Sequence, residues 1–374
     1  MRKILFINEN ALGHSSYLPV FAREIETHPE YGFQVEMLSV APLPEEYECE
    51  ANQDFRGAAR LGLSQHYRRW REAASRYAAK LAREALVRDR YAAVVVNTQS
   101  VALDLPAVLP PDLPLFVCLD ATFEQLRLSP WFAANQLSRL LQPWTIGNLV
   151  EKEQKLYARA EKLLPWSEPV AQSLREQYSI DPDRIEILPP SLPLNSPVFA
   201  QNNSGGGEGL PQILFLGGDF RRKGGPLLLE CFRRHFRGKA ELQIVTQSEV
   251  QPEEGVKVWK NIKAYSPEWL ERWRRASVFV FPSLLETFGI VLLEAQAFSV
   301  PTVSSRAGAA VTLLAEGKAG WLIDPQNEAS LQGAIAEALA KSDLAKEKVL
   351  YAKERLEREN DQSRNAIRLL GWVR

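Results

Sequence analysis

The chain has few cysteines, no long apolar run and almost no net charge, and each absence excludes a class of protein. Its cysteines, Cys49, Cys118 and Cys231, form an odd and widely spaced set, which argues against a disulfide framework or a zinc cluster and favours the cytoplasm. No apolar run approaches the ~18 residues of a membrane span, and the apolar start is interrupted at Asn8, which argues against a signal peptide. With 45 Lys and Arg against 46 Asp and Glu, the chain has no overall positive electrostatic field that would attract nucleic acid.

The length and the order of the expected elements predict two α/β domains. At 374 residues, with 45% hydrophobic content, the chain is long enough to fill two cores. Apolar runs of strand length alternate with helix-like segments, as in doubly wound sheets. Strands of the first domain are expected at 3–7, 35–38, 92–96, 115–119 and 162–165. Strands of the second are expected at 185–188, 213–216, 242–245, 278–281, 302–304 and 320–323.

A glycine-rich stretch marks the expected boundary between the two domains. Residues 200–209 are low in apolar side chains, so they are predicted to be a linker or loop. We therefore expect a first domain at 1–195, an interdomain linker at 196–211, a second domain at 212–350 and a helical tail at 351–374.

Two glutamates, Glu286 and Glu294, form the most informative pair. A run of helix length at 290–298 follows the expected strand at 278–281, so Glu286 lies in the intervening loop and Glu294 about five residues into the helix. The helix N-terminus between them offers free N–H groups and a positive dipole end, which attract a phosphate. The alternative is a solvated loop acid and a surface helix residue.

A second anion-suited loop follows the expected strand at 213–216. Gly217 and Gly218 let the backbone approach a ligand, and the cations Arg222 and Lys223 come next. Arginine pairs bidentately with phosphate oxygens, whereas lysine supplies a point charge. The alternative is a basic surface turn, but no other phosphate-loop motif competes for this segment.

Together these motifs resemble the GT-B glycosyltransferases of family 4, the glycosyl transferases group 1. The spaced pair of glutamates matches at Glu286 and Glu294, and the glycine-arginine-lysine-glycine element matches at 218–224. Further matches lie at 161–167, 178–190, 301–308 and 316–325. The likeness is strong over about 150–335, weaker at the N-terminal glycine loop and absent as a motif from about 40 to 110. The resemblance implies two Rossmann-like doubly wound domains that face a central cleft.

The resemblance also implies a function and a set of donor contacts. The chain would move a sugar from a UDP-, GDP- or ADP-sugar to an acceptor hydroxyl with retention, and its tail would cross back to the N-terminal, acceptor-side domain. Arg222 and Lys223 would stabilise the departing diphosphate, Glu286 would position the sugar and Glu294 would take the ribose. Because cations and the helix dipole neutralise the diphosphate, no metal or other cofactor is required. The donor-binding residues are then Gly217, Gly218, Arg222, Lys223, Glu286, Thr287, Phe288, Gly289 and Glu294.

Acceptor-side residues are expected where strands of the first domain end. Gly13 and His14 follow the first strand, where the family keeps a glycine loop; a capping or solvated histidine is the alternative. Asp120 follows the strand at 115–119, where many relatives carry a histidine, and a carboxylate there faces the crevice that binds ligands. We expect Asp120 to accept the proton of the acceptor hydroxyl, with a helix N-cap as the alternative. The acceptor itself, a saccharide, lipid or small molecule, is not identified.

Several departures and alternatives limit the resemblance. Ser191 stands where the family usually has glycine, Thr312 replaces a usual glutamate, and the Asp-x-Asp spacing at 181–183 reads as a turn and not as a metal site. A nucleotide-sugar epimerase, a phosphorylase, or a catalytically silent nucleotide-binding subunit would share the fold. The basic region that begins at 68–71, with its tryptophan, allows peripheral membrane contact as an alternative to a solvated helix face.

Overall fold

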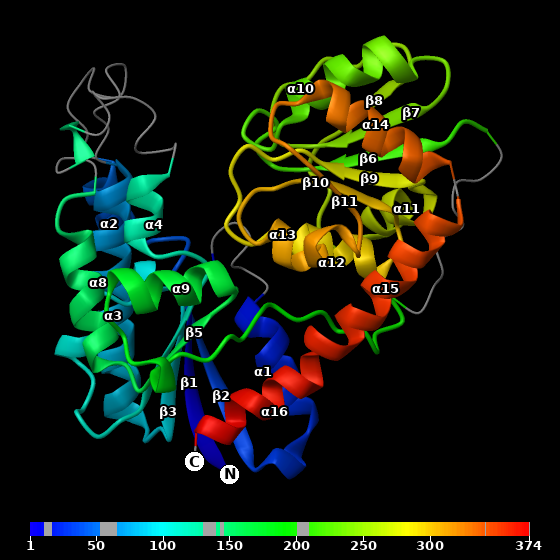
Figure 1. Ribbon diagram of the computed structural model, residues 1–374. Coiled ribbons are helices and arrows are strands. Elements are labelled where there is room, and N and C mark those ends of the chain that lie inside the picture. Colours follow the sequence, from blue (N-terminus) through cyan, green and yellow to red (C-terminus); the bar gives the residue numbers. More distant parts are fainter. Residues whose placement is uncertain are drawn as a thin grey trace. The chain divides into compact units, whose positions relative to one another are not determined.

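The structure divides the chain into two compact units. It is a computed structural model that describes residues 1–10, 17–52, 66–129, 140–142, 146–199, 209–340 and 342–373. The first unit comprises Met1–Ser191 together with Gln362–Arg374, and the second comprises Leu192–Asp361 (Figure 1). Among the helices so described, none combines the length and apolar character that crossing a bilayer requires.

The first unit is built on a parallel five-stranded sheet in the order β2-β1-β3-β4-β5. Its strands are β1 (Arg2–Asn8), β2 (Phe33–Ser39), β3 (Ala93–Asn97), β4 (Leu115–Leu119) and β5 (Lys162–Pro165). Its helices are α1 (Tyr17–Thr27), η2 (Pro29–Tyr31), α2 (Glu45–Ala51), α3 (His66–Arg88), η4 (Gln99–Val101), η5 (Leu105–Ala107), α4 (Phe123–Leu128), α8 (Leu149–Arg159), α9 (Glu168–Gln177), η6 (Pro182–Arg184) and α16 (Gln362–Trp372).

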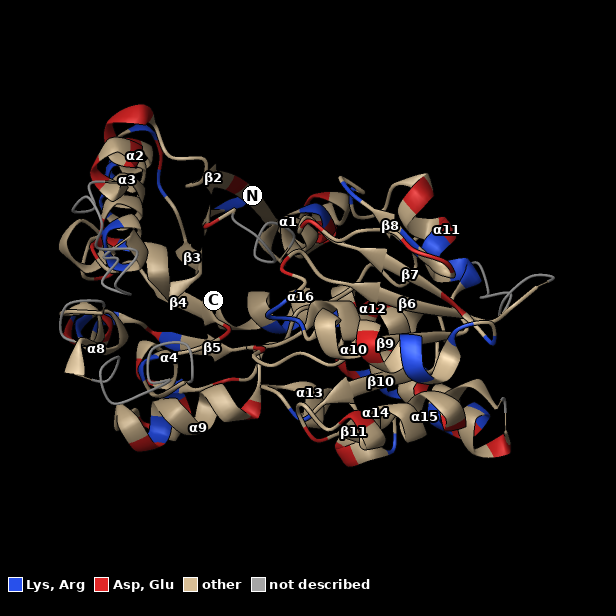
Figure 2. Cartoon of the chain, turned by 90° about the horizontal axis from the view of Figure 1, so that it is seen from above, with Lys and Arg blue, Asp and Glu red and all other residues tan. Residues whose placement is uncertain are grey.

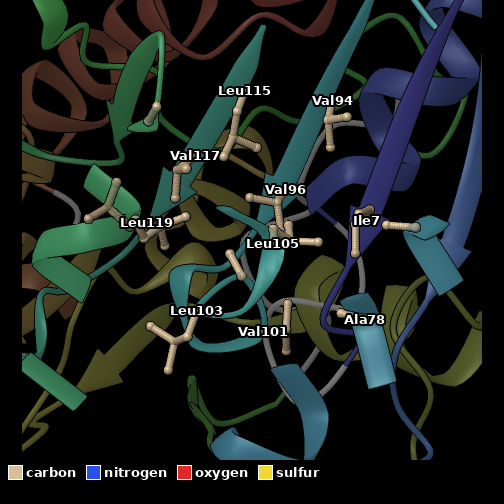
Figure 3. Close-up of a cluster of buried hydrophobic side chains, with 14 of the residues drawn as sticks. Ile7, Ala78, Val94, Val96, Val101, Leu103, Leu105, Leu115, Val117 and Leu119 are labelled. Carbon is tan, nitrogen blue, oxygen red and sulfur yellow. The ribbon is translucent and has the colours of Figure 1, made fainter. Parts of the chain in front are cut away.

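The core of the first unit explains why its central strands read as unbroken apolar runs. Every residue of β3 and β4 is buried, as expected of parallel strands that are covered on both faces. Figure 3 shows one side of this core, where alternate side chains such as Val96 and Val117 share a cluster with Ala78 of α3 and Val101. Small alanines on α3 let this helix lie close to the strands.

The second unit is built on a parallel six-stranded sheet in the order β11-β10-β9-β6-β7-β8. Its strands are β6 (Gln212–Leu216), β7 (Glu241–Val245), β8 (Val256–Trp259), β9 (Val278–Phe281), β10 (Thr302–Ser305) and β11 (Trp321–Ile323). Its helices are α10 (Gly225–Cys231), the π-helix η7 (Phe232–Phe236), α11 (Pro267–Arg275), α12 (Ile290–Ala297), α13 (Ala310–Leu313), η8 (Ala315–Gly317), α14 (Glu328–Leu339) and α15 (Asp343–Glu359).

Two expectations about strands are wrong. Residues 185–188 were expected to form a strand of the second domain, but they lie in the first unit beside β5 and form only an isolated bridge there. The N–H groups of Glu186 and Leu188 donate to the carbonyls of Leu163 and Pro165, but Pro165 has no N–H to return a bond. Strand β8 was not predicted, because its short alternating sequence contains a lysine and lies at the edge of the sheet.

The strand orders locate a switch point in each sheet. In the second unit the chain winds outward from β6 to β8 on one side and from β9 to β11 on the other, so β6 and β9 are neighbours at the point of reversal. In the first unit the corresponding neighbours are β1 and β3. Ligands of open α/β sheets bind outside the carboxyl ends of the strands at such points.

Candidate functional site

The two predicted anion loops come together at the switch point of the second unit. One loop follows β6 and the other follows β9, and they are joined through their backbones: Leu284 N donates to Arg222 O over 3.0 Å. The Arg222 Nη1 donates in return to the Leu285 carbonyl over 3.2 Å. The structure therefore brings together the two motifs that the sequence separates by more than sixty residues.

Glycines make this close approach of the loops feasible. Gly224 has a φ of 76°, and a methyl group added there would lie 1.8 Å from the Pro282 carbonyl oxygen. A methyl group on Gly217 would lie 3.0 Å from the Lys223 side chain, so Gly217 leaves room for this lysine. Gly218 is exposed, with no atom within 4 Å of an added methyl group. Packing between the loops accounts for Gly224, whereas Gly218 is left open for a ligand.

Lys223 and Glu286 form an ion pair at the centre of this arrangement. The Lys223 ammonium contacts Glu286 Oε2, and the two side chains are only 13% and 9% exposed. Burial lowers the pKa of Lys223, although the negative charge of Glu286 opposes that shift. The ammonium also lies 5.0 Å from the centre of the Phe281 ring. The alternative of a basic surface turn therefore does not hold for Lys223, which is mostly buried beside its partner.

Arg222 is held more loosely than Lys223. Its side chain is 31% exposed, and its Nε lies 3.7 Å from Asp219 Oδ2. The same carboxylate group accepts a hydrogen bond from the Arg222 backbone N–H over 3.0 Å. One face of the guanidinium thus remains near solvent at the edge of the joined loops, where it can reach an anion.

Glu294 lies on α12, and it is buried. The helix begins at Ile290, after Gly289 with a φ of 93°, so Glu294 is its fifth residue as predicted. Only 8% of this residue is exposed, and burial raises the pKa of its carboxyl to about 8. Within the described parts of the chain, no group donates a hydrogen bond to that carboxyl. The alternative of a surface helix residue is therefore wrong, and the carboxyl is available to a hydroxyl.

The loop between these glutamates packs against a third segment, residues 308–309. Phe288 is buried, and the Thr287 carbonyl accepts a hydrogen bond from Ala309 N over 3.2 Å. Gly308 has a φ of 55°, and a methyl group on it would lie 2.0 Å from the Glu286 carbonyl oxygen. The backbone that carries Glu286 therefore rests on a position where only glycine fits.

On the first unit, Asp120 lies directly after β4, and Gly13 and His14 fall outside the described residues. Asp120 is not a helix N-cap, because Thr122 caps α4 and forms a capping box with Gln125. The carboxylate of Asp120 is therefore placed at the carboxyl end of the sheet without that structural role. The aspartates at 181–183 form a capped turn, in which the Asp181 side chain accepts from Asp183 N.

Sequence reasoning missed a buried acid next to this edge. Glu153 of α8 is fully buried and accepts hydrogen bonds from Phe123 N, Tyr157 Oη and Tyr178 Oη. Burial raises its pKa to about 8, although these hydrogen bonds oppose the shift. Its only signal in the sequence is a glutamate four residues before a tyrosine, which is too common to predict such a network.

Known proteins resemble this chain both in sequence and in fold. Residues 200–355 match the family model described as glycosyl transferases group 1. A D-inositol 3-phosphate glycosyltransferase of Pseudarthrobacter chlorophenolicus is 30% identical over 47% of this chain and 47% of its own length. A protein of the same name from Geodermatophilus obscurus is 28% identical over 51% of this chain and 48% of its own length. The chain thus spans about half the length of these curated relatives.

Solved structures match over nearly the whole chain. Sucrose-phosphate synthase from Thermosynechococcus elongatus superposes with a TM-score of 0.70 at 17% identity, covering 99% of this chain and 97% of its own. The Anabaena protein HepE, solved with UDP and glucose, superposes with a TM-score of 0.63 at 16% identity, covering 99% of each chain. Likeness at this identity establishes the fold. Residues 200–355 therefore resemble the glycosyl transferases group 1, and the chain has the α/β, two-domain GT-B fold.

Proposed function

We propose that this protein transfers a sugar from a nucleoside diphosphate sugar to an acceptor hydroxyl, with retention and without a metal ion. The observation that carries the proposal is the meeting of Arg222, Lys223 and Glu286 at the switch point of the family-matched unit. This is the place where open α/β sheets bind nucleotides. The activity named for curated relatives, of which the chain covers 47% in the first case, supports the proposal.

The ion pair suggests how donor binding proceeds. Diphosphate oxygens carry more negative charge than one carboxylate, so they compete with Glu286 for the Lys223 ammonium. Glu286 then becomes available to hydroxyls of the sugar, while Lys223 and Arg222 stabilise charge on the departing diphosphate. As the bond from the anomeric carbon to the diphosphate breaks, the acceptor oxygen bonds to that carbon, and its proton passes to Asp120.

Glu294 is assigned to the ribose of the donor. With a pKa of about 8 its carboxyl is largely protonated at pH 7, so it can both donate to and accept from hydroxyl groups. A contact of this kind is present before and during the reaction, so it contributes mainly to donor affinity.

A thermal shift screen against UDP, GDP and ADP tests the proposal. One of them should raise the melting temperature equally with and without EDTA, because a ligand that binds only the folded state stabilises it, by about 2.7 kcal/mol at a hundredfold excess over Kd. Release of free sugar from the matching donor, with its anomeric configuration followed by NMR, then separates transfer from simple binding. Loss of the shift in EDTA would show that a metal is needed, and a shift without turnover would indicate a silent binding subunit.

A further inference from the structure

The start of α3 lies at the edge of the first sheet where an acceptor would bind. Ala74 and Ala78 of this helix are fully buried in the core cluster. Arg71 and Tyr67 precede Ala74 by three and seven residues, so they continue the same sheet-facing stripe. The helix also packs against η4, which directly follows the carboxyl end of β3. The stripe therefore continues past the strand ends, toward the switch point between β1 and β3.

Arg71 differs from the cations farther along this helix. Arg76, Lys80 and Arg88 each pair with a glutamate of the same unit, and Figure 2 shows basic and acidic residues together around α2 and α3. Arg71 instead lies 3.4 Å above the Tyr67 ring and donates to the Tyr67 carbonyl over 3.2 Å. Within the described ranges, no carboxylate pairs with Arg71, and its buried Nε has no acceptor. The guanidinium is thus held in place by Tyr67, without an ion pair among the described residues.

Among the described residues, no acid at this edge forms an ion pair with Arg71. Glu9, just after β1, accepts hydrogen bonds from Thr98 Oγ1 over 2.6 Å and from Ser100 Oγ over 2.8 Å. Glu153 is buried and hydrogen-bonded, with a pKa raised to about 8, so it is largely neutral at pH 7. Asp120 is the acid assigned above to the acceptor hydroxyl. Burial raises the pKa of Tyr67 to about 12, with smaller contributions from Asp120 and Glu9, which places the Arg71–Tyr67 pair within electrostatic reach of both.

From this geometry we infer that the acceptor carries an anionic group, a phosphate or carboxylate, which the Arg71 guanidinium binds. The inference rests on the proposed glycosyl transfer and specifies its acceptor. Arginine matches the planar, two-oxygen geometry of phosphate and carboxylate, and stacking on Tyr67 leaves its edge N–H groups to make such bonds. The acceptor would then be held at two points, with its anion on Arg71 and its reacting hydroxyl at Asp120.

Calorimetry on the full chain tests the inference with matched pairs of probes. Glucose 6-phosphate and D-inositol 3-phosphate are compared with glucose and inositol, and vesicles with phosphatidylinositol are compared with neutral vesicles. At least one phosphorylated probe should bind about tenfold or more tightly than its neutral counterpart, the effect of one charge-assisted hydrogen bond. Preference for the soluble probes identifies a sugar phosphate, and preference for the vesicles identifies a lipid headgroup.

Three variants distinguish recognition from a structural effect. Arg71→Gln should abolish the preference for the phosphorylated probe, Arg71→Lys should retain part of it, and Arg76→Ala, whose residue already pairs with Glu50, should leave it unchanged. Circular dichroism checks that each variant folds. If Arg71→Gln does not fold, the comparison of Arg71→Lys with the unaltered protein still decides the test. The inference is wrong if no phosphorylated probe is preferred, or if all variants behave alike, while nucleotide still binds. Loss of nucleotide binding by the unaltered protein would instead contradict the proposed function.

Discussion

Removing one member of the Lys223–Glu286 pair should destabilise the second unit more than removing both. In Lys223→Met the Glu286 side chain, 9% exposed, loses its cation, and in Glu286→Gln the ammonium loses its counter-charge. Each single variant therefore leaves a mostly buried charge without compensation. The double variant replaces both charges with neutral groups of similar size, so it leaves no buried charge.

The exposed fractions set the expected magnitude. Breaking a fully buried pair from one side costs about 3–5 kcal/mol, whereas exposed pairs are worth about 0.2–1 kcal/mol. With side chains that are 13% and 9% exposed, each single variant should cost about 2–3 kcal/mol. The double variant should cost less than either single variant, so the coupling energy should exceed the cost of one single variant and reach about 3 kcal/mol.

Urea unfolding of the full chain measures this coupling. The transition of the second unit can be followed by the fluorescence of Trp269 and Trp273, which are buried in that unit. Saturating nucleoside diphosphate should protect Glu286→Gln more than Lys223→Met, because only the first retains the cation for phosphate. Additive costs, or single variants within about 0.5 kcal/mol of the unaltered protein, would refute the reasoning about a coupled buried pair.

Three further predictions concern residues of the second unit and one buried glutamate of the first. Lys223→Ala, in a folded protein, should lower transfer by about a hundredfold in a steady-state assay; near-normal turnover would remove its diphosphate role. Gly224→Ala should be destabilised by about 2 kcal/mol or more in thermal melts, while the matched Gly218→Ala keeps its stability. Because burial raises the pKa of Glu294 and Glu153 from 4.5 to about 8, the stability from their protonated forms is present below pH 4.5 and lost as pH rises through about 8. Glutamine at either position should flatten the fall in unfolding free energy between about pH 4.5 and 8, and an unchanged slope would contradict the assignment.

Much of the strand pattern could be predicted because central parallel strands are apolar along their whole length. The runs at 115–119 and 162–165 match β4 and β5 in full, because polar residues or turns directly follow the apolar residues of each strand. The edge strand β8 carries no such signal, because it is short and contains a lysine, and it was missed for that reason. The extended residues at 185–188 show that an apolar run does not form a strand when its neighbour lacks an N–H.

The candidate site could be located from the sequence, but its electrostatics could not. The strand-loop-helix order placed Glu286 and Glu294 correctly, because helix periodicity and glycine positions are local properties. The pairing of Lys223 with Glu286 depends on β6 and β9 being neighbours, which no local pattern reveals. The environment of Arg71 could not be predicted either. In the sequence it is one of several basic residues, and only the structure shows its contact with Tyr67.

The placement of α16 has a consequence for how the chain is synthesised and cut. This helix follows the second unit in sequence but packs on α1, where Gln362 Nε2 donates to Glu24 Oε2 over 2.8 Å and Asn365 Nδ2 donates to Ser191 Oγ over 2.8 Å. The second unit is one continuous segment, so on the ribosome it can fold before α16 emerges. The first unit lacks its last helix until then. A cut near Asp361 that releases α16 would expose apolar surface on a unit built mainly from residues 1–191.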